Sequence, residues 1–385
     1  MAMSQERLVS VDFWRGFALL TIFINHVPGL FLEPLTYRNF GVSDAAELFV
    51  LLAGVSAAFA YLRGFRPGDR LLVTGRVWLR AFSLYAAHLA LVLIAIATIG
   101  GFAVMNGDTR VLELYHLDLL LRMPLEALLG IVMLTFQPAY LNILPLYVVV
   151  LLMAPVLILL MRRSVVLGLG ASIALYVAAN TWSLAPPVWP NDGRWFFNPF
   201  AWQLLFACGL AIGKAIDAGR PLVANRLLDI LAPIYLVACL GWVLAGFPFS
   251  LEIWPLPDFI WSFDKTSLPL PRLLHVLALV YCISRLPLEK WLRSMVAAVP
   301  LIQMGRHSLP VFCVGTVLSL AAQAVRPGFD GAFAFDLVII TLGFTIQWLV
   351  AWTLEWQRSG RKNKAVVQTP AVASPGTVTP GAPAR

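Results

Sequence analysis

Long apolar runs separated by short polar segments dominate the 385 residues of this chain. Each run is about 17–28 residues long, which is near the length that a helix needs to cross the hydrocarbon core of a bilayer. The pattern predicts ten membrane-spanning helices, at residues 13–31, 44–62, 77–104, 141–161, 165–183, 199–216, 228–247, 269–286, 306–325 and 336–356. A further apolar stretch, 119–136, is interrupted by Arg122, Pro124 and Glu126. We expect that stretch to form an interfacial or re-entrant helix on the outer side.

The composition supports this interpretation. Hydrophobic residues make up 60% of the chain and charged residues 12%, whereas about a quarter of the residues in a soluble domain are charged. A transmembrane β-barrel is also excluded, because its strands alternate polar and apolar residues. The four cysteines lie in apolar stretches without a CxxC pair, so neither a metal site nor a disulfide framework is expected. The predicted fold class is therefore all-α, a polytopic membrane helix bundle.

The basic residues predict the orientation of the bundle. If the N-terminus is cytoplasmic, 20 of the 28 Lys and Arg residues fall in cytoplasmic segments and 7 in outer segments. This bias is the one that membrane proteins show, and it places both termini in the cytoplasm. Residues 1–357 form the predicted transmembrane domain. Residues 358–385 begin basic and continue with Pro, Thr, Ala and Gly, so we expect a disordered cytoplasmic tail.

The first predicted helix carries three ionisable residues, Asp12, Arg15 and His26. Such residues within a membrane are costly and are candidates for function. Arg15 and His26 are eleven residues apart, so they share one helix face and lie about 16 Å apart along its axis. An anionic donor that enters from the cytoplasm would meet Arg15 first, and its reactive end could reach His26. The structural alternatives are an anchor paired with Asp12 for Arg15, and an interhelical hydrogen bond for His26.

Two carboxylates, Asp44 and Glu47, lie at the outer start of the second predicted helix. A carboxylate beside His26 would fix the tautomer of the imidazole and stabilise its protonated form. The alternative is a helix cap at Ser43 or Asp44, with acidic residues favoured in the first turn. Gly54, later in this helix, is interpreted as a helix-packing residue.

These motifs resemble the acyltransferase-3 superfamily of membrane acyltransferases, whose members show arginine and histidine separated by ten residues, as in Arg15 and His26. The OpgC-type branch is the closer match. Three further elements carry the resemblance: S-D-A-A-E-L-F-V at 43–50, L-N-I-L-P-L-Y at 141–147 and G-R-H-S-L-P-V-F at 305–312. The chain departs from the wider superfamily at Ala53, where serine is usual.

The resemblance implies an O-acyltransferase of the bacterial inner membrane. It would move an acyl group, succinyl in this branch, from cytoplasmic acyl-CoA to hydroxyls of a periplasmic glucan. Acyl-CoA would be a co-substrate, with no permanently bound cofactor and no nucleic-acid partner. We assign His26 as general base with Asp44 or Glu47 orienting it, and a transient acyl-histidine is the alternative path. The acyl-CoA would be held by four residues: Asp12, Arg15, Arg306 and His307.

Asn142, Tyr147 and Trp195 lie at predicted outer helix ends and are candidates for binding sugar, although aromatic belts at the membrane interface explain the rings equally well. His88 and His275 are interpreted as interhelical hydrogen-bonding residues. The competing hypothesis for the whole chain is a multipass transporter or flippase for a sugar or an anion. In that case the ionisable residues of the first helix would bind substrate or relay protons.

Overall fold

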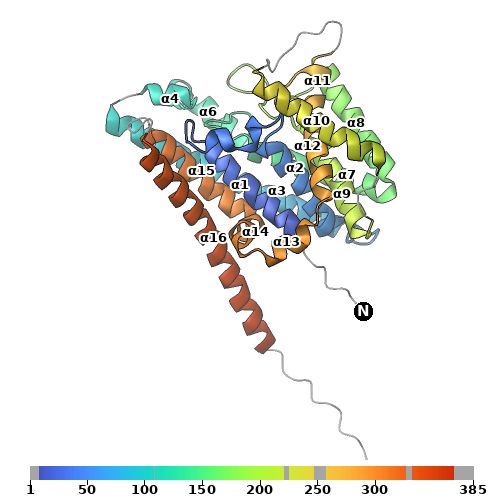
Figure 1. Ribbon diagram of the computed structural model, residues 1–385. Coiled ribbons are helices and arrows are strands. Elements are labelled where there is room, and N and C mark those ends of the chain that lie inside the picture. Colours follow the sequence, from blue (N-terminus) through green and yellow to red (C-terminus); the bar gives the residue numbers. More distant parts are fainter. Residues whose placement is uncertain (1–7, 108, 221–224, 247–256, 327–331, 368–385) are drawn as a thin grey trace, which may run out of the picture.

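The computed structural model describes residues 8–107, 109–220, 225–246, 257–326 and 332–367. Within these ranges the elements are helices, apart from one isolated bridge between Pro187 and Arg194. Seven described helices are long and apolar enough to cross a membrane: α2 with its π-helical continuation (Ala45–Leu62), α3 (Arg70–Asn106), α7 (Ile143–Arg163), α9 (Pro199–Asp217), α10 (Arg226–Leu244), α15 (Ser308–Val325) and α16 (Phe333–Val367). The all-α polytopic bundle predicted from the hydropathy pattern is confirmed (Figure 1).

The other three predicted spans correspond to shorter or bent helices. α12 (Leu270–Ser284) and α13 (Leu288–Ser294) meet at an angle of 69° and count as an eighth candidate span if they are taken together. α1 (Val9–Asn25) and α8 (Val165–Thr181) have 17 residues each. α1 begins and ends earlier than the predicted 13–31. It ends at Asn25 because the chain turns at Pro28-Gly29, where Gly29 has a φ of 81°.

The stretch 119–136 forms two short helices, α5 (Leu119–Arg122) and α6 (Pro124–Val132). The nine residues of α6 are too few to cross a bilayer. Figure 1 shows α6 together with α4 (Arg110–Leu114) and α11 (Asp258–Trp261) at one end of the bundle, whereas α13 and α14 (Val299–Arg306) lie at the end nearer the N-terminus. The first end therefore corresponds to the predicted outer side.

α16 is longer than the sequence pattern predicted. It continues to Val367 and extends beyond the bundle in Figure 1, so residues 358–367 are helical and not part of a disordered tail. Lys, Arg and Ala favour helices, and the first proline of the tail comes only at Pro370. The remainder of the predicted tail, residues 368–385, lies outside the described residues.

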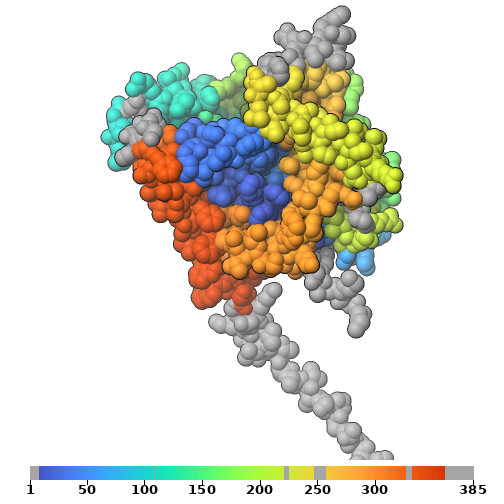
Figure 2. Space-filling view, in the orientation of Figure 1, coloured from blue at the N-terminus to red at the C-terminus, as the bar shows by residue number. Residues whose placement is uncertain are grey.

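Close helix contacts fix the position of α1. It packs against α14, α2 and α15, and a Cβ atom at Gly16 or Gly305 would collide with the backbone of the opposite helix. Gly54 has the same role between α2 and α9, as predicted from the sequence. In Figure 2 the blue N-terminal residues occupy the middle of this face, between the orange-red C-terminal helices and the yellow α10. α1 is thus held in the centre of the bundle, with Arg15 and His26 between neighbouring helices.

Candidate functional site

His26 follows the last residue of α1, and its ring orientation is set by the helix itself. The Nδ1 atom of His26 lies 2.7 Å from the carbonyl oxygen of Ile22. A carbonyl oxygen only accepts hydrogen bonds, so Nδ1 carries the proton and Nε2 is left with its lone pair. The backbone of His26 is held as well, because the Nε2 amide of Gln323 donates to the His26 carbonyl oxygen. The ring thus has the tautomer that a general base needs.

His26 lines a cavity of about 240 Å³, which we call the outer cavity. Its other lining residues include Asp44, Tyr140, Asn142 and Lys265, from segments predicted to lie at the outer end of the bundle, and Phe312 and Gln347, from within predicted spans. The ring of Tyr140 is tilted against the imidazole, with 5.9 Å between ring centroids. Ala139 and Tyr140 both have positive φ values, 55° and 62°. Such backbone conformations are unfavourable for residues other than glycine and are often found at functional sites.

Tyr115 supports the outer cavity from the loop between α4 and α5. Its hydroxyl donates to Oε1 of Gln323, the same side chain that holds the backbone of His26. Burial raises the pKa of Tyr115 to about 12, so this hydroxyl keeps its proton at neutral pH and remains a donor. The amide of Gln323 is therefore held at both ends.

Arg15 lines a second cavity, of about 200 Å³, which we call the inner cavity. Its Nη1 lies 3.4 Å from the hydroxyl of Ser56, and its Nη2 donates to the hydroxyl of Ser308. Arg80, from α3, also lines this cavity. Two guanidinium groups in one cavity form a site suited to an anion, since arginine matches phosphate and carboxylate geometry.

Three aromatic side chains of the inner-cavity lining, Phe49, Tyr147 and Phe312, pack against one another. Phe312 lines both cavities. Its ring stacks on Phe49, with centroids 6.4 Å apart and planes at 24°, and Phe49 in turn meets Tyr147 edge-on at 5.6 Å. The hydroxyl of Tyr147 donates to the carbonyl oxygen of Phe49 over 2.7 Å. Phe312 therefore marks the place where the two cavities adjoin.

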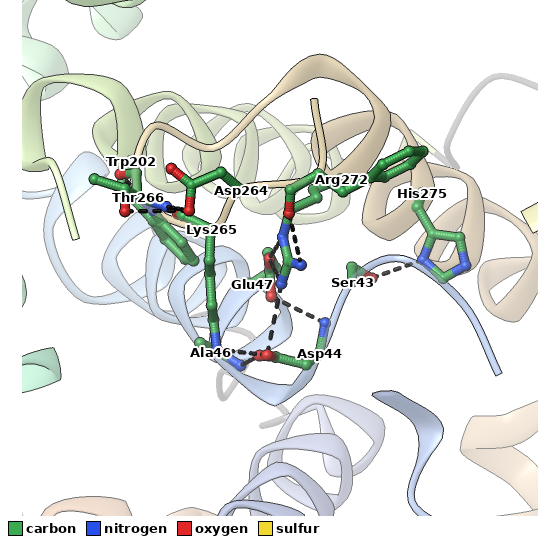
Figure 3. Close-up of polar contacts among 11 residues, drawn as sticks. Ser43, Asp44, Ala46, Glu47, Trp202, Asp264, Lys265, Thr266, Arg272 and His275 are labelled. Carbon is green, nitrogen blue, oxygen red and sulfur yellow. Dashed lines mark hydrogen bonds and ion pairs between the residues drawn. The ribbon is translucent and has the colours of Figure 1, made fainter. Parts of the chain in front are cut away.

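Asp44 and Glu47 belong to a cluster of four charges that joins the start of α2 to the segment before and within α12 (Figure 3). Arg272 reaches both acids: its Nη2 lies 2.5 Å from Oε1 of Glu47 and 3.5 Å from Oδ2 of Asp44. Lys265 forms an ion pair with Asp44. The Glu47 side chain is fully buried and that of Arg272 is 10% exposed. This cluster fixes α2 against α12 without a charge left unpaired.

The same two acids also cap α2. Oδ1 of Asp44 accepts from the Ala46 amide over 2.8 Å, and Oε2 of Glu47 accepts from the Asp44 amide over 3.0 Å. This reciprocal capping box is the structural alternative that the sequence left open. The acceptor that orients the His26 ring is the carbonyl oxygen of Ile22 and not a carboxylate. The expectation that Asp44 or Glu47 orients His26 is therefore corrected.

The arrangement can be compared with known proteins. A family model described as OpgC protein matches residues 7–359. The chain belongs to the OpgC family. No curated protein and no solved structure matches it. The family and the helical bundle together support a membrane acyltransferase of the OpgC type, as the sequence motifs predicted, while membership of the wider acyltransferase-3 superfamily stays a prediction.

In this OpgC-family protein, three of the expected acyl-CoA residues lie outside the lining of the inner cavity. Asp12 Oδ2 lies 3.4 Å from Nε of Arg306, and Nη1 of Arg306 lies 3.4 Å from Glu355. His307 Nε2 lies 2.8 Å from the other oxygen of Glu355. Their polar atoms thus serve contacts between α1, α14 and α16. The second basic residue of the inner cavity is Arg80, and not Arg306. In the sequence, Arg80 stood out only as a basic residue near the cytoplasmic end of a predicted span.

The expected sugar-binding residues divide in the same way. Asn142 lines the outer cavity of the OpgC-family protein. Tyr147 lines the inner cavity, and its hydroxyl is bonded to Phe49. Trp195 is 4% exposed, and its indole NH donates to the carbonyl oxygen of Pro187 over 3.1 Å. Both expectations are corrected, because these rings pack in the core and are not presented to a ligand in the outer cavity.

The two remaining buried histidines also differ. Nδ1 of His275 lies 2.7 Å from the hydroxyl of Ser43, which confirms the predicted hydrogen bond between segments. The ring nitrogens of His88 have no hydrogen-bond partner within the described part of the chain, so the same prediction for His88 is wrong there.

Proposed function

We propose that this OpgC-family protein transfers an acyl group, succinyl by its family resemblance, from cytoplasmic acyl-CoA to a hydroxyl of a periplasmic glucan. One observation carries the proposal: a single helix presents a guanidinium group, Arg15, to the inner cavity and an imidazole, His26, to the outer cavity. The bacterial inner membrane is the location that fits a cytoplasmic donor and a periplasmic acceptor.

The inner cavity is the proposed donor site. Arg15 and Arg80 attract an anionic donor, and their planar donors suit its phosphates. Arg15 and His26 are eleven positions apart, a distance of about 16 Å along the helix axis. The extended arm of acyl-CoA would follow this axis and bring its thioester past Phe312 to the imidazole. No resident cofactor enters this account.

The outer cavity is the proposed acceptor site. His26 Nε2 removes the proton from a glucan hydroxyl as the hydroxyl oxygen attacks the thioester carbonyl carbon. The carbon–sulfur bond then breaks, and the imidazolium gives this proton to the coenzyme A thiolate. In the alternative path, Nε2 first attacks the thioester carbonyl carbon, the carbon–sulfur bond breaks, and coenzyme A leaves as the thiolate. The glucan hydroxyl then attacks the acyl-histidine, the carbon–nitrogen bond breaks, and the hydroxyl proton passes through the imidazole to the thiolate. The Ile22 hydrogen bond leaves Nε2 available for either role.

The acceptor would contact polar and aromatic groups around His26. Asn142 supplies an amide that can both donate and accept hydrogen bonds. Tyr140 is 57% exposed and lies against the imidazole, so its ring is placed to stack on a sugar. These two residues replace Tyr147 and Trp195 as the proposed glucan contacts.

The test uses the full chain purified in detergent, where no transmembrane gradient exists. Isotope-labelled succinyl-CoA and a glucose oligosaccharide are added, and labelled ester is measured by mass spectrometry, with His26→Gln as the matched control. An acyltransferase forms the ester, and the His26→Gln protein does not. Uptake of glucan or anion into sealed vesicles, with no ester formed under either condition, would contradict the proposal and favour the transporter hypothesis.

A further inference from the structure

Gln347, on α16, is fully buried and lines the outer cavity. Its Nε2 donates to the carbonyl oxygen of Gly343 over 3.0 Å. This bond fixes the orientation of the amide, because a carbonyl cannot donate in return. The other end, Oε1, has no hydrogen-bond partner within the described part of the chain. A buried polar atom in this state is costly unless a ligand satisfies it.

The neighbouring residues of α15 offer the same kind of group. The hydroxyl of Thr316 donates to the backbone carbonyl oxygen of Phe312 over 2.9 Å. The hydroxyl of Ser319 donates to the backbone carbonyl oxygen of Thr316 over 2.8 Å. Both residues line the outer cavity. Because their protons are already used, these hydroxyls can only accept further hydrogen bonds. Gln347, Thr316 and Ser319 therefore each present an acceptor oxygen to the outer cavity.

Gly315 makes room for this arrangement. A Cβ atom at Gly315 would lie 2.8 Å from Oε1 of Gln347, closer than ordinary packing allows. Elsewhere the outer cavity is lined by the donors Lys265 and Arg38. The lining therefore combines cationic side chains with the acceptor oxygens of Gln347, Thr316 and Ser319.

We infer that Gln347, Thr316 and Ser319 form a subsite that accepts hydrogen bonds from a hydroxyl of the acceptor sugar, other than the hydroxyl that is acylated. This inference rests on the proposed function. A carboxylate or phosphate has no proton to donate and would be repelled here, whereas a sugar hydroxyl can donate to Oε1. The subsite would position the acceptor, and Gln347 is accordingly a positioning residue that takes no part in bond making.

The test measures KM for both substrates in the detergent assay, with a glucose oligosaccharide as acceptor. Gln347→Met keeps the length of the side chain and removes the acceptor oxygen. We expect KM for the oligosaccharide to rise roughly 3- to 10-fold, the effect of one neutral hydrogen bond, while KM for succinyl-CoA stays unchanged. Gly315→Ala displaces the amide and should shift the same constant, which keeps the test valid if Gln347→Met does not fold.

Gln303→Met is the matched control, because the amide of Gln303 accepts from Trp348 over 2.8 Å and lines neither cavity. It should leave both KM values unchanged. Monodeoxy analogues of the oligosaccharide identify the hydroxyl involved. One analogue should bind the wild-type protein less tightly than the unmodified oligosaccharide does, whereas Gln347→Met should bind that analogue and the unmodified oligosaccharide equally well. An unchanged KM for the oligosaccharide in both Gln347→Met and Gly315→Ala overturns the subsite. If the wild-type protein forms no ester at all, the proposed function fails instead.

Discussion

Nδ1 of His26 lies 2.7 Å from the carbonyl oxygen of Ile22, one turn earlier on α1. The helix therefore orients its own terminal imidazole, and no carboxylate is needed to fix the tautomer. Catalytic bases are commonly oriented by a third group, and here the backbone supplies it. From the sequence, the acids at the start of α2 were expected to orient His26. In the structure these acids cap α2, and the helix backbone orients His26.

The first prediction concerns His26. His26→Gln removes the proton acceptor and preserves a polar side chain of similar size. We expect the rate of ester formation to fall by about 10²–10⁴-fold, the usual contribution of a general base, with an unfolding temperature near that of the wild-type protein. His275→Gln is the control, because His275 is bonded to Ser43 and lines neither cavity. Retained activity in His26→Gln would show that the imidazole is not the base.

The second prediction concerns Glu47. Arg272→Met leaves the Glu47 carboxylate without its closest partner in a buried site. We expect a loss of about 3–5 kcal/mol in the free energy of unfolding, the usual cost of breaking a buried ion pair from one side. Thermal unfolding in detergent measures it, and the double variant Arg272→Met with Glu47→Gln should recover part of the loss.

The activity of Glu47→Gln, expressed per folded molecule, separates a structural role from a catalytic one. We expect it to stay close to wild type, since the Glu47 side chain contacts Arg272 and the Asp44 amide. If Glu47→Gln is as stable as the wild-type protein but inactive, Glu47 takes part in catalysis.

The third prediction concerns the inner cavity. Arg15→Gln and Arg80→Gln each remove a positive charge from its lining. Hydrogen bonds to charged groups contribute about 1.5–3 kcal/mol, so KM for acyl-CoA should rise at least about 10-fold while KM for glucan stays constant. Arg306→Gln serves as the control: it should lower stability, because Asp12 and Glu355 lose a partner, without this selective effect. Equal KM values for acyl-CoA in all four proteins would place the donor elsewhere.

The fourth prediction concerns Phe312, which the two cavities share. Phe312→Leu shortens the side chain that lines both of them. Water should then reach the thioester more easily, so hydrolysis of acyl-CoA without glucan should increase relative to ester formation. Phe344→Leu is the control, since Phe344 packs against the core and lines neither cavity. The ratio of free acid to ester, measured by mass spectrometry, should stay constant if Phe312 is not the barrier.

The sequence could predict those features that depend on one helix. The common face of Arg15 and His26 follows from helical periodicity, and the cap at Asp44 follows from local spacing. The partners of Asp44 and Glu47 could not be found in this way, because Lys265 and Arg272 lie 221 and 225 residues further along the chain. The contacts of Arg306 and His307 with Glu355 could not be found for the same reason, since Glu355 comes from another helix, and their contact with acyl-CoA stays a prediction.

Burial separated the remaining candidates. Tyr147 and Trp195 were predicted at outer helix ends, but neither lines the outer cavity. Tyr140, two residues before Asn142, does line it. Gln347 gave no signal, because a single glutamine in an apolar helix is most simply a packing residue. Its role depends on the unused Oε1 atom, which only the assembled bundle reveals.

The most direct test of the central claim is mass spectrometry of periplasmic glucans from cells that carry the intact gene, a deletion, or His26→Ala at matched abundance in the membrane. The account predicts an acyl increment on the glucans of the first strain and its absence from the other two. If glucans from the His26→Ala strain keep their acyl groups, His26 is not the residue that transfers them, and the transporter hypothesis becomes the better explanation of the charges in α1.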